Sequence, residues 1–228
     1  MADAYFGPGL FQFLTLLRQN NDRAWFAANK ERYEREVRDP MLQFITDAAV
    51  PLARVSRQIL ADPRPVGGSL FRIYRDTRFS KDKTPYKTHV AAHFRHRAGK
   101  DVHAPGFYFH LEPGRVLLGT GIWHPDPPAL LKIRGALAKN PAGWKRVIGS
   151  APFRRMCTLE GDAVRRPPRG FAPDHPLIED IKRKDFTAMT ILPEAEALKP
   201  TLMKKFEAFC RTTAPLNAFL AKALGLNW

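Results

Sequence analysis

Residues 72–89, RIYRDTRFSKDKTPYKTH, concentrate the side chains of this sequence that are best suited to holding an anion. Six of these positions are lysine or arginine. Guanidinium groups bind the oxygens of a phosphate or carboxylate in pairs, and ammonium and phenol groups add single hydrogen bonds. We expect Asp76 to orient the arginines by pairing with them. The residues expected to bind the anion are Arg72, Arg75, Arg78, Lys83, Tyr86 and Lys87. The segment therefore predicts a basic pocket for a phosphorylated or carboxylated small molecule.

Two other interpretations of residues 72–89 stay open. In the first, the segment is a charged connector that keeps the surface solvated. In the second, the protein is a nucleic-acid-binding module whose cations follow the phosphates while Tyr74, Phe79 or Tyr86 stacks on bases. That interpretation ranks below the pocket because no recognisable nucleic-acid motif accompanies the charge. The two functions differ in whether the cations line a concave pocket or an open stripe.

His110 is the candidate proton carrier. It shares the polar face of an expected strand with Tyr108 and Glu112, because residues two apart on a strand point to the same side. Histidine can transfer protons near neutral pH, and a neighbouring carboxylate can orient the ring. A simple hydrogen-bonded pair of His110 and Glu112 is the competing interpretation, so whether the pocket catalyses a reaction stays open.

No metal or cofactor is expected from the sequence. His89, His93 and His96 would line up as metal ligands on a helix, but on the strand that the neighbouring residues favour, His96 points away. No nucleotide-binding, zinc-protease or serine-hydrolase motif occurs. His124 is expected to shape a turn, and Trp123 to pack against a helix.

The elements that position these side chains follow from hydrophobic periodicity. Helical spacing predicts one helix over 10–17, a second over 25–37 that ends before Pro40, and a third over 41–59 that Pro51 kinks. From residue 67 the period changes to two, which is typical of half-buried strands. The strands expected are 70–76, 90–95, 107–112 and 115–123, with 184–192 as a further candidate.

Helices are also expected after the main strands. Asp126 and Pro127 predict a helix start, and a short helix is expected around Trp144. Two closing helices are predicted over 201–210 and 215–224. No repeat or convincing linker divides the chain, so we expect residues 1–228 to form a single α+β domain. Its sheet should be mostly antiparallel, with four to five strands packed against the N-terminal and C-terminal helices.

The composition limits the setting and the partners. The 228 residues carry a net charge of +15, which attracts polyanions such as nucleic acid, anionic lipid or phosphorylated metabolites. Two cysteines without a CxxC pair are typical of a reducing compartment. No secretory signal and no stretch long enough to span a bilayer is found, so we expect a cytoplasmic protein without a membrane partner. The sequence leaves the oligomeric state open.

Several segments resemble an uncharacterised bacterial family, domain of unknown function 2461. The central motif is FRIYRDTRFSKDKTPYK, and FLTLLRQNNDRAWFAANKERYE resembles the N-terminal segment of the family. GFYFHLEP, GTGIWHP, PPRGFAPDHPLIEDIKRKDF and LNAFL extend the similarity over nearly the whole chain. The resemblance implies a single conserved fold, but the family has no established activity to carry over. Its matching motif positions are Arg72, Arg75, Asp76, Arg78, Phe79, Ser80, Lys83, Pro85, Tyr86 and Lys87.

Overall fold

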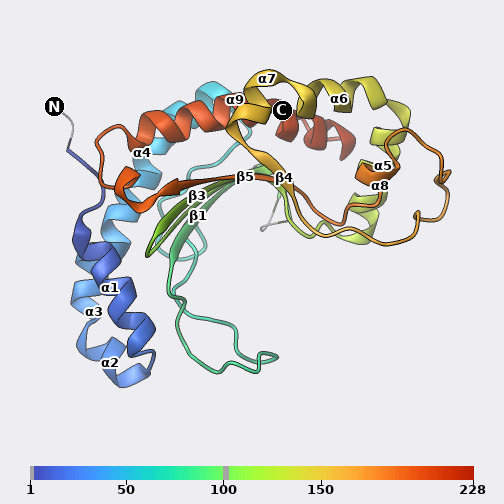
Figure 1. Cartoon of the computed structure of the whole chain (residues 1–228). Helices are drawn as coiled ribbons and strands as arrows, with labels where there is room; N and C mark the ends of the chain where they lie inside the picture. The colour runs from blue at the N-terminus through green and yellow to red at the C-terminus, as the bar shows by residue number, and fades with distance from the viewer. Residues whose placement is uncertain (1–2, 100–102) are drawn as a thin grey trace.

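A five-stranded antiparallel sheet forms the centre of the computed structural model, which describes residues 3–99 and 103–228 (Figure 1). The strands lie in the order β1-β2-β3-β5-β4. Their bounds are β1 Val90–Arg95, β2 Gly106–Glu112, β3 Arg115–Ile122, β4 Thr158–Glu160 and β5 Phe186–Pro193. The α+β class and the antiparallel sheet expected from the sequence are confirmed.

Two long helices, α4 (Asp39–Val55) and α9 (Leu202–Ala223), cover one face of the sheet (Figure 1). The core lies between these layers. Phe44 of α4 stacks on Phe109 of β2 with 4.3 Å between the ring centroids, and Phe206 of α9 also packs on Phe109. Side chains alternate between the two faces of a strand, so each strand gives every second residue to this core. The intervening residues face away from α9.

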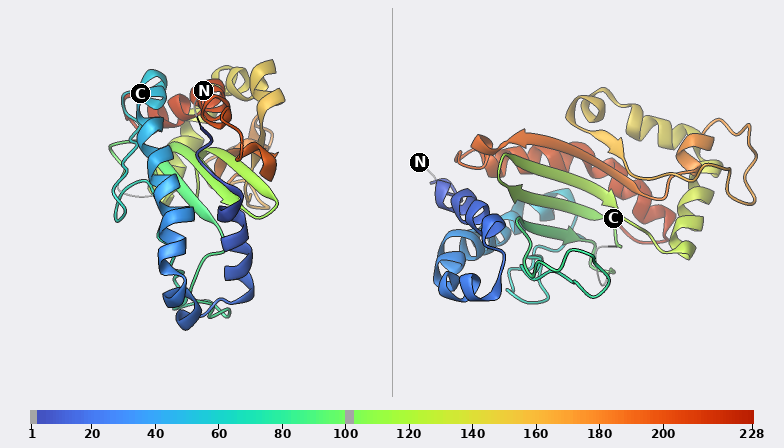
Figure 2. Two further views of the ribbon diagram at one scale, coloured as in Figure 1. Left: turned by 90° about the vertical axis from the view of Figure 1, so that its left-hand side faces the viewer. Right: turned by 60° about the horizontal axis from the view of Figure 1, so that its bottom comes forward.

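The N-terminal helices extend beyond one end of the sheet (Figures 1 and 2). Helix α1 spans Pro8–Gln19, and α2 (Arg23–Ala28) and α3 (Lys30–Tyr33) lead through the π-helical turn η1 (Glu34–Arg38) into α4. The prediction that a helix stops before Pro40 is wrong. The backbone stays helical from η1 into α4, and Pro40 falls in the first turn of α4, where the change from π-helical to α-helical pairing tolerates a missing N–H.

The C-terminal half surrounds the far end of the sheet. Helices α5 (Pro127–Lys139), α6 (Pro141–Gly149) and α7 (Ala151–Met156) follow β3, and α8 (Ile178–Ile181) precedes β5. Asp126 caps α5 by accepting a hydrogen bond from the Ala129 N–H, as expected from the sequence. The expected pair of closing helices is instead the single helix α9, and Pro215 lies inside it. The apolar residues on both sides of Pro215 pack into the same core, which holds the helix together across that position.

The expected strand over 70–76 is also wrong. Leu70 forms an isolated bridge to Ala92, and Tyr74 forms one to Tyr86. The chain pairs with itself here, because the Arg75 N–H donates to Pro85 O and the Lys87 N–H donates to Ile73 O. Residues 73–87 therefore form an irregular hairpin that lies outside the sheet. The sequence pattern also missed β4, which has three residues and is too short to show a period.

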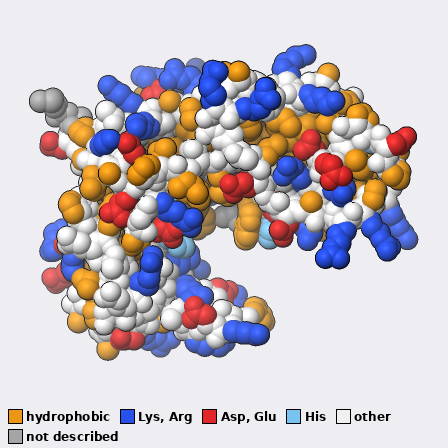
Figure 3. All heavy atoms as spheres, viewed as in Figure 1, with side chains coloured by type: hydrophobic (Ala, Val, Ile, Leu, Met, Phe, Trp, Pro, Cys, Tyr) orange, Lys and Arg blue, Asp and Glu red, His pale blue; other side chains and the backbone are white. Residues whose placement is uncertain are grey.

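Within the described ranges, no helix combines the length and the apolar character needed to cross a bilayer. The uncovered face of the sheet is seen in the right-hand view of Figure 2, with the 73–87 hairpin along its edge. In the space-filling view the molecule is hollowed beneath the sheet, and histidine side chains are visible in the hollow (Figure 3).

Candidate functional site: a pocket on the uncovered face of the sheet

A pocket of about 510 Å³ lies on the face of the sheet that α4 and α9 leave uncovered. One row of residues crosses the pocket from strand to strand. In this row His93 is the cross-strand partner of Tyr108, Tyr108 of Gly119, and Gly119 of Met189. A volume of this size is typical of sites for small molecules and cofactors. The antiparallel register thus brings residues from four strands to the wall of a single site.

Glycines form the floor of the pocket. Gly106 and Gly121 are paired across β2 and β3, and Gly119 lies on the same face of β3. Gly121 has a φ of 109°, and a Cβ atom there would lie 1.9 Å from the carbonyl oxygen of Phe186. Only glycine can occupy this position without moving the backbone of β5. Because these three glycines have no side chains, the centre of the sheet is hollow on this face.

Aromatic rings form the walls. Phe71 stacks on His93 at 6.4 Å and meets the edge of Tyr108 at 6.1 Å between centroids. Trp123, on another side of the pocket, is 51% exposed and lies against the His124 ring. From the sequence, Trp123 is expected to pack against a helix; in the structure its half-exposed side chain lines the pocket. These rings provide flat apolar surface for a ligand.

Of the lysines and arginines in the described part of the chain, only Lys87 lines this pocket. Its Nζ donates to Arg72 O at 2.9 Å and lies 5.4 Å from the centre of the Phe71 ring. Burial lowers the pKa of Lys87, and the positive charge of Arg72 lowers it further. Lys87 therefore reaches the pocket, and Arg72 lies next to it without lining the pocket.

The other cations expected at the anion site lie in the exposed hairpin. Arg78 forms an ion pair with Asp76 at 2.7 Å, and the hydrogen bonds from Arg78 lower the pKa of Asp76 to about 2. Arg75 pairs with Asp82 and with the hydroxyl of Thr84. Lys83 donates to Thr77 O at 2.9 Å. These three cations are bound within the hairpin and do not converge on the pocket.

Tyr86 anchors the hairpin to the helical layer. The side chain is 5% exposed, and the ring stacks on Phe26 of α2 at 4.1 Å. Asn21 fixes the backbone on both sides, because its Nδ2 donates to Tyr86 O and its Oδ1 accepts from the Tyr86 N–H. Burial raises the pKa of Tyr86. In this position Tyr86 holds the segment in place rather than facing the pocket.

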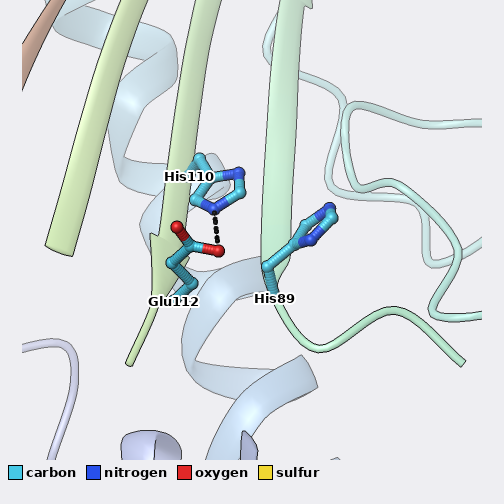
Figure 4. Close-up of side chains that lie close together, drawn as sticks. All are labelled: His89, His110 and Glu112. Atoms are coloured by element: carbon cyan, nitrogen blue, oxygen red, sulfur yellow. Dashed lines mark ion pairs between the residues drawn. The ribbon is translucent and has the colours of Figure 1, made fainter. Parts of the chain in front are cut away.

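A second group of candidate side chains, His89, His110 and Glu112, adjoins the pocket (Figure 4). His110 Nε2 lies 3.5 Å from Glu112 Oε2, and the rings of His89 and His110 stack at 4.4 Å. Tyr108 Oη is hydrogen-bonded to His110 Nδ1 at 2.9 Å. In the sequence, His89 is spaced to form a group with His93 and His96. The sheet instead brings His89 beside β2, and His96 is buried and bonded to Asn227 O.

Burial determines the charge states of this group. It lowers the pKa of His89 to about 4 and also lowers the pKa of His110, so both rings are neutral at physiological pH. Burial by itself raises the pKa of Glu112, but the hydrogen bond from Arg115 and the nearby His110 outweigh it and leave a pKa below the usual value. The group is therefore a carboxylate beside two neutral imidazoles.

A smaller hollow of about 240 Å³ shares Trp123, Thr187 and Met189 with the pocket. Here the Asp185 side chain, which is 2% exposed, contacts His124. One carboxylate oxygen accepts a hydrogen bond from the backbone N–H of His124 at 2.7 Å and also lies 2.5 Å from Nδ1 of the His124 ring. His124 has a φ of 47°, which is uncommon for a non-glycine residue. The sequence predicts only a turn at His124. No local pattern links it to Asp185, which lies 61 positions away.

Comparison with known proteins gives a family but no activity. A family model described as "Conserved hypothetical protein (DUF2461)" matches residues 9–219, which include the pocket, the hairpin and the histidine group. No curated protein and no solved structure matches the chain.

Proposed function

Because this chain belongs to the conserved hypothetical protein family DUF2461, whose description names no activity, we propose a function from the pocket itself. The protein binds a small molecule that combines a flat apolar body with one phosphate or carboxylate group. The apolar body lies over the glycine floor between Phe71, Tyr108 and Trp123. The anionic group contacts Lys87. The ligand is proposed to be a cytoplasmic metabolite, in keeping with a chain whose two cysteines are free.

The observation that carries this proposal is the environment of Lys87. An ammonium group has three N–H donors, and within the described part of the chain Lys87 Nζ donates one hydrogen bond, to the backbone carbonyl of Arg72. Within residues 3–99 and 103–228, no carboxylate forms an ion pair with it. A half-buried cation without a counterion is costly, and a ligand anion would offset that cost.

Nucleic-acid binding is the second candidate, and one observation favours it. Phe79 at the tip of the hairpin is 94% exposed, and the Arg78 guanidinium lies 5.8 Å from its ring. Such an aromatic residue beside cations can stack on an unpaired base. It ranks second because Arg75 and Arg78 are already paired with acids, as are Lys182 and Arg183 near α8.

A dye that has the proposed chemistry tests the pocket. 8-Anilinonaphthalene-1-sulfonate joins flat aromatic rings to an anionic sulfonate, and its fluorescence rises when it is bound. We expect one site on the parent protein. Lys87→Met should weaken the binding about tenfold, the value of one charge-assisted hydrogen bond. Lys83→Met removes the same charge from the exposed hairpin and should leave the binding unchanged. Competition by phenyl phosphate and by benzoate then shows which anion is preferred.

Equal dye affinity in the two lysine variants would contradict the pocket proposal. The second candidate is measured separately with a fluorescent single-stranded oligonucleotide. Oligonucleotide binding that Phe79→Ala abolishes and Lys87→Met leaves intact would favour the nucleic-acid function instead.

A further inference from the structure

His89, His110 and Glu112 offer metal-binding atoms that all lie within 4.8 Å of one another. The three residues come from two parts of the chain. His89 is the last residue before β1, at the end of the basic segment 72–89, and His110 and Glu112 lie on β2. Two imidazoles and one carboxylate form a ligand set used by both zinc and non-haem iron sites. We propose that these three residues bind one divalent transition-metal ion such as zinc. This inference does not rest on the proposed small-molecule ligand.

The strongest support comes from His110. Its Nε2 is buried and makes no hydrogen bond of normal geometry within the described residues, because its nearest carboxylate oxygen, Glu112 Oε2, is 3.5 Å away. A buried polar atom of this kind is uncommon and destabilising. The other ring nitrogen, Nδ1, is 2.9 Å from Tyr108 Oη. In the tautomer that carries its proton on Nδ1, the ring donates that proton to Tyr108 and leaves a lone pair on Nε2. Metal-binding histidines usually make such a hydrogen bond through the nitrogen that does not bind the metal.

Glu112 divides its two oxygens between different partners. Oε1 accepts a hydrogen bond from Arg115 Nε, and Oε2 is the oxygen 3.5 Å from His110 Nε2 (Figure 4). Arg115 thus fixes the carboxylate while one oxygen faces the imidazole. Outer partners of this kind orient ligating carboxylates in known metal sites.

His89 completes the group with a modest movement. Two ligands of a tetrahedral zinc ion, each about 2.1 Å from the metal, are about 3.4 Å apart. The separation of up to 4.8 Å must therefore shorten when a metal binds. His89 precedes the first residue of β1 and is half-buried, so rotation of its side chain can supply this change.

A metal ion here would adjoin the pocket. His89 and Tyr108 both line the pocket, and three protein ligands leave a coordination position for water or for an anion. The chemical consequence is a Lewis acid beside the site where the anionic group of a small molecule would bind.

Metal titration of protein without a histidine tag, stripped of metal by a chelator, tests the inference. Co²⁺ binding is followed by its visible absorption and Zn²⁺ binding by calorimetry, both without any organic ligand. We expect one equivalent of metal to bind and expect His110→Ala or Glu112→Gln to abolish that binding. Tyr108→Phe should weaken it about tenfold, as is usual for an outer partner. His175→Ala, in the loop before α8 and away from the pocket, is the matched control and should bind like the parent.

The inference is overturned if the parent takes up no stoichiometric metal, or if His110→Ala and Glu112→Gln bind as well as His175→Ala. Circular dichroism confirms the fold of each variant, and Glu112→Gln, which is nearly the same shape, decides the matter if His110→Ala does not fold. Dye binding in metal-free protein reports the pocket separately, so failure of the metal site and failure of the proposed function are distinguishable.

Discussion

At the scale of single residues, the buried Asp185 side chain is held by several polar contacts. Its oxygens accept hydrogen bonds from the backbone N–H groups of His124 and Asp162 and contact His124 Nδ1. Asparagine keeps the shape but replaces one acceptor oxygen by a donor. We therefore expect Asp185→Asn to lower the free energy of unfolding by about 1–3 kcal/mol. Thermal unfolding should show a fall in Tm of roughly 2–4 °C for each kcal/mol lost.

The same carboxyl predicts a pH dependence of stability. Burial by itself raises the pKa of Asp185, but the hydrogen bonds from His124 and Asp162 outweigh it, so the folded-state pKa is below the usual value. The unfolded chain then binds the proton more readily, and Asp185 stabilises the fold above its unfolded pKa of about 3.9. This contribution is lost as the pH falls below that value. The Tm difference between the parent and Asp185→Asn should therefore shrink between neutral and acidic pH. A difference independent of pH would contradict this account.

At the scale of elements, the floor of the pocket depends on a close approach between β3 and β5. Gly121 combines a φ of 109° with a Cβ position 1.9 Å from Phe186 O. We expect Gly121→Ala to lower the free energy of unfolding by about 2 kcal/mol or more, since both backbone strain and a steric clash are introduced. In Gly119→Ala, on the same strand, the added atom is 3.2 Å from Tyr108 Cβ and φ is ordinary. Urea unfolding should show a clearly smaller loss for Gly119→Ala, and equal losses would count against the proposed cause.

Helix α9 is tied to the sheet near this floor by the buried Asn217. Its Nδ2 donates to Gly106 O and Thr120 Oγ1, and its Oδ1 accepts from the Gly121 N–H. Asn217→Ala leaves these buried groups without partners, so we expect it to lower the free energy of unfolding by about 2–4 kcal/mol. Thr212→Ala, on the same helix but only partly buried, is a milder change of similar kind. A loss in Asn217→Ala no larger than in Thr212→Ala would contradict a connecting role.

At the scale of the whole molecule, the hydrophobic core runs from Phe6 to Leu220 and includes residues of α1, the sheet and α9. We therefore expect cooperative unfolding of residues 1–228 as a single domain. Limited proteolysis should trim the ends or cut the exposed loop at 160–172, where few apolar side chains are buried. Two stable fragments divided near residue 65, between the helical start and the sheet, would contradict this expectation.

The amino-acid sequence by itself determined four of the five strands, their faces and the main helical segments. Alternation placed Tyr108, His110 and Glu112 on one polar face of β2, and the register of the sheet agrees. Helical spacing indicated the apolar faces of α1 and α4, although it did not detect the continuity through Pro40 or Pro215. These features are set by neighbours within a few positions, so a local pattern contains the information.

Tertiary structure alone decided which residues meet. The alignment of β2 with β3 places Gly106 opposite Gly121 and so opens the pocket. The folded hairpin pairs Arg75 and Arg78 with acidic side chains, whereas Lys87 reaches the pocket. The contacts of His124 with Asp185 and of His89 with His110 likewise depend on strand register. Charge and residue type alone would allow many other side-chain pairs of the same kind. The packing of the whole core selects among them, because a shift of one residue along a strand would turn every apolar side chain away from α4 and α9.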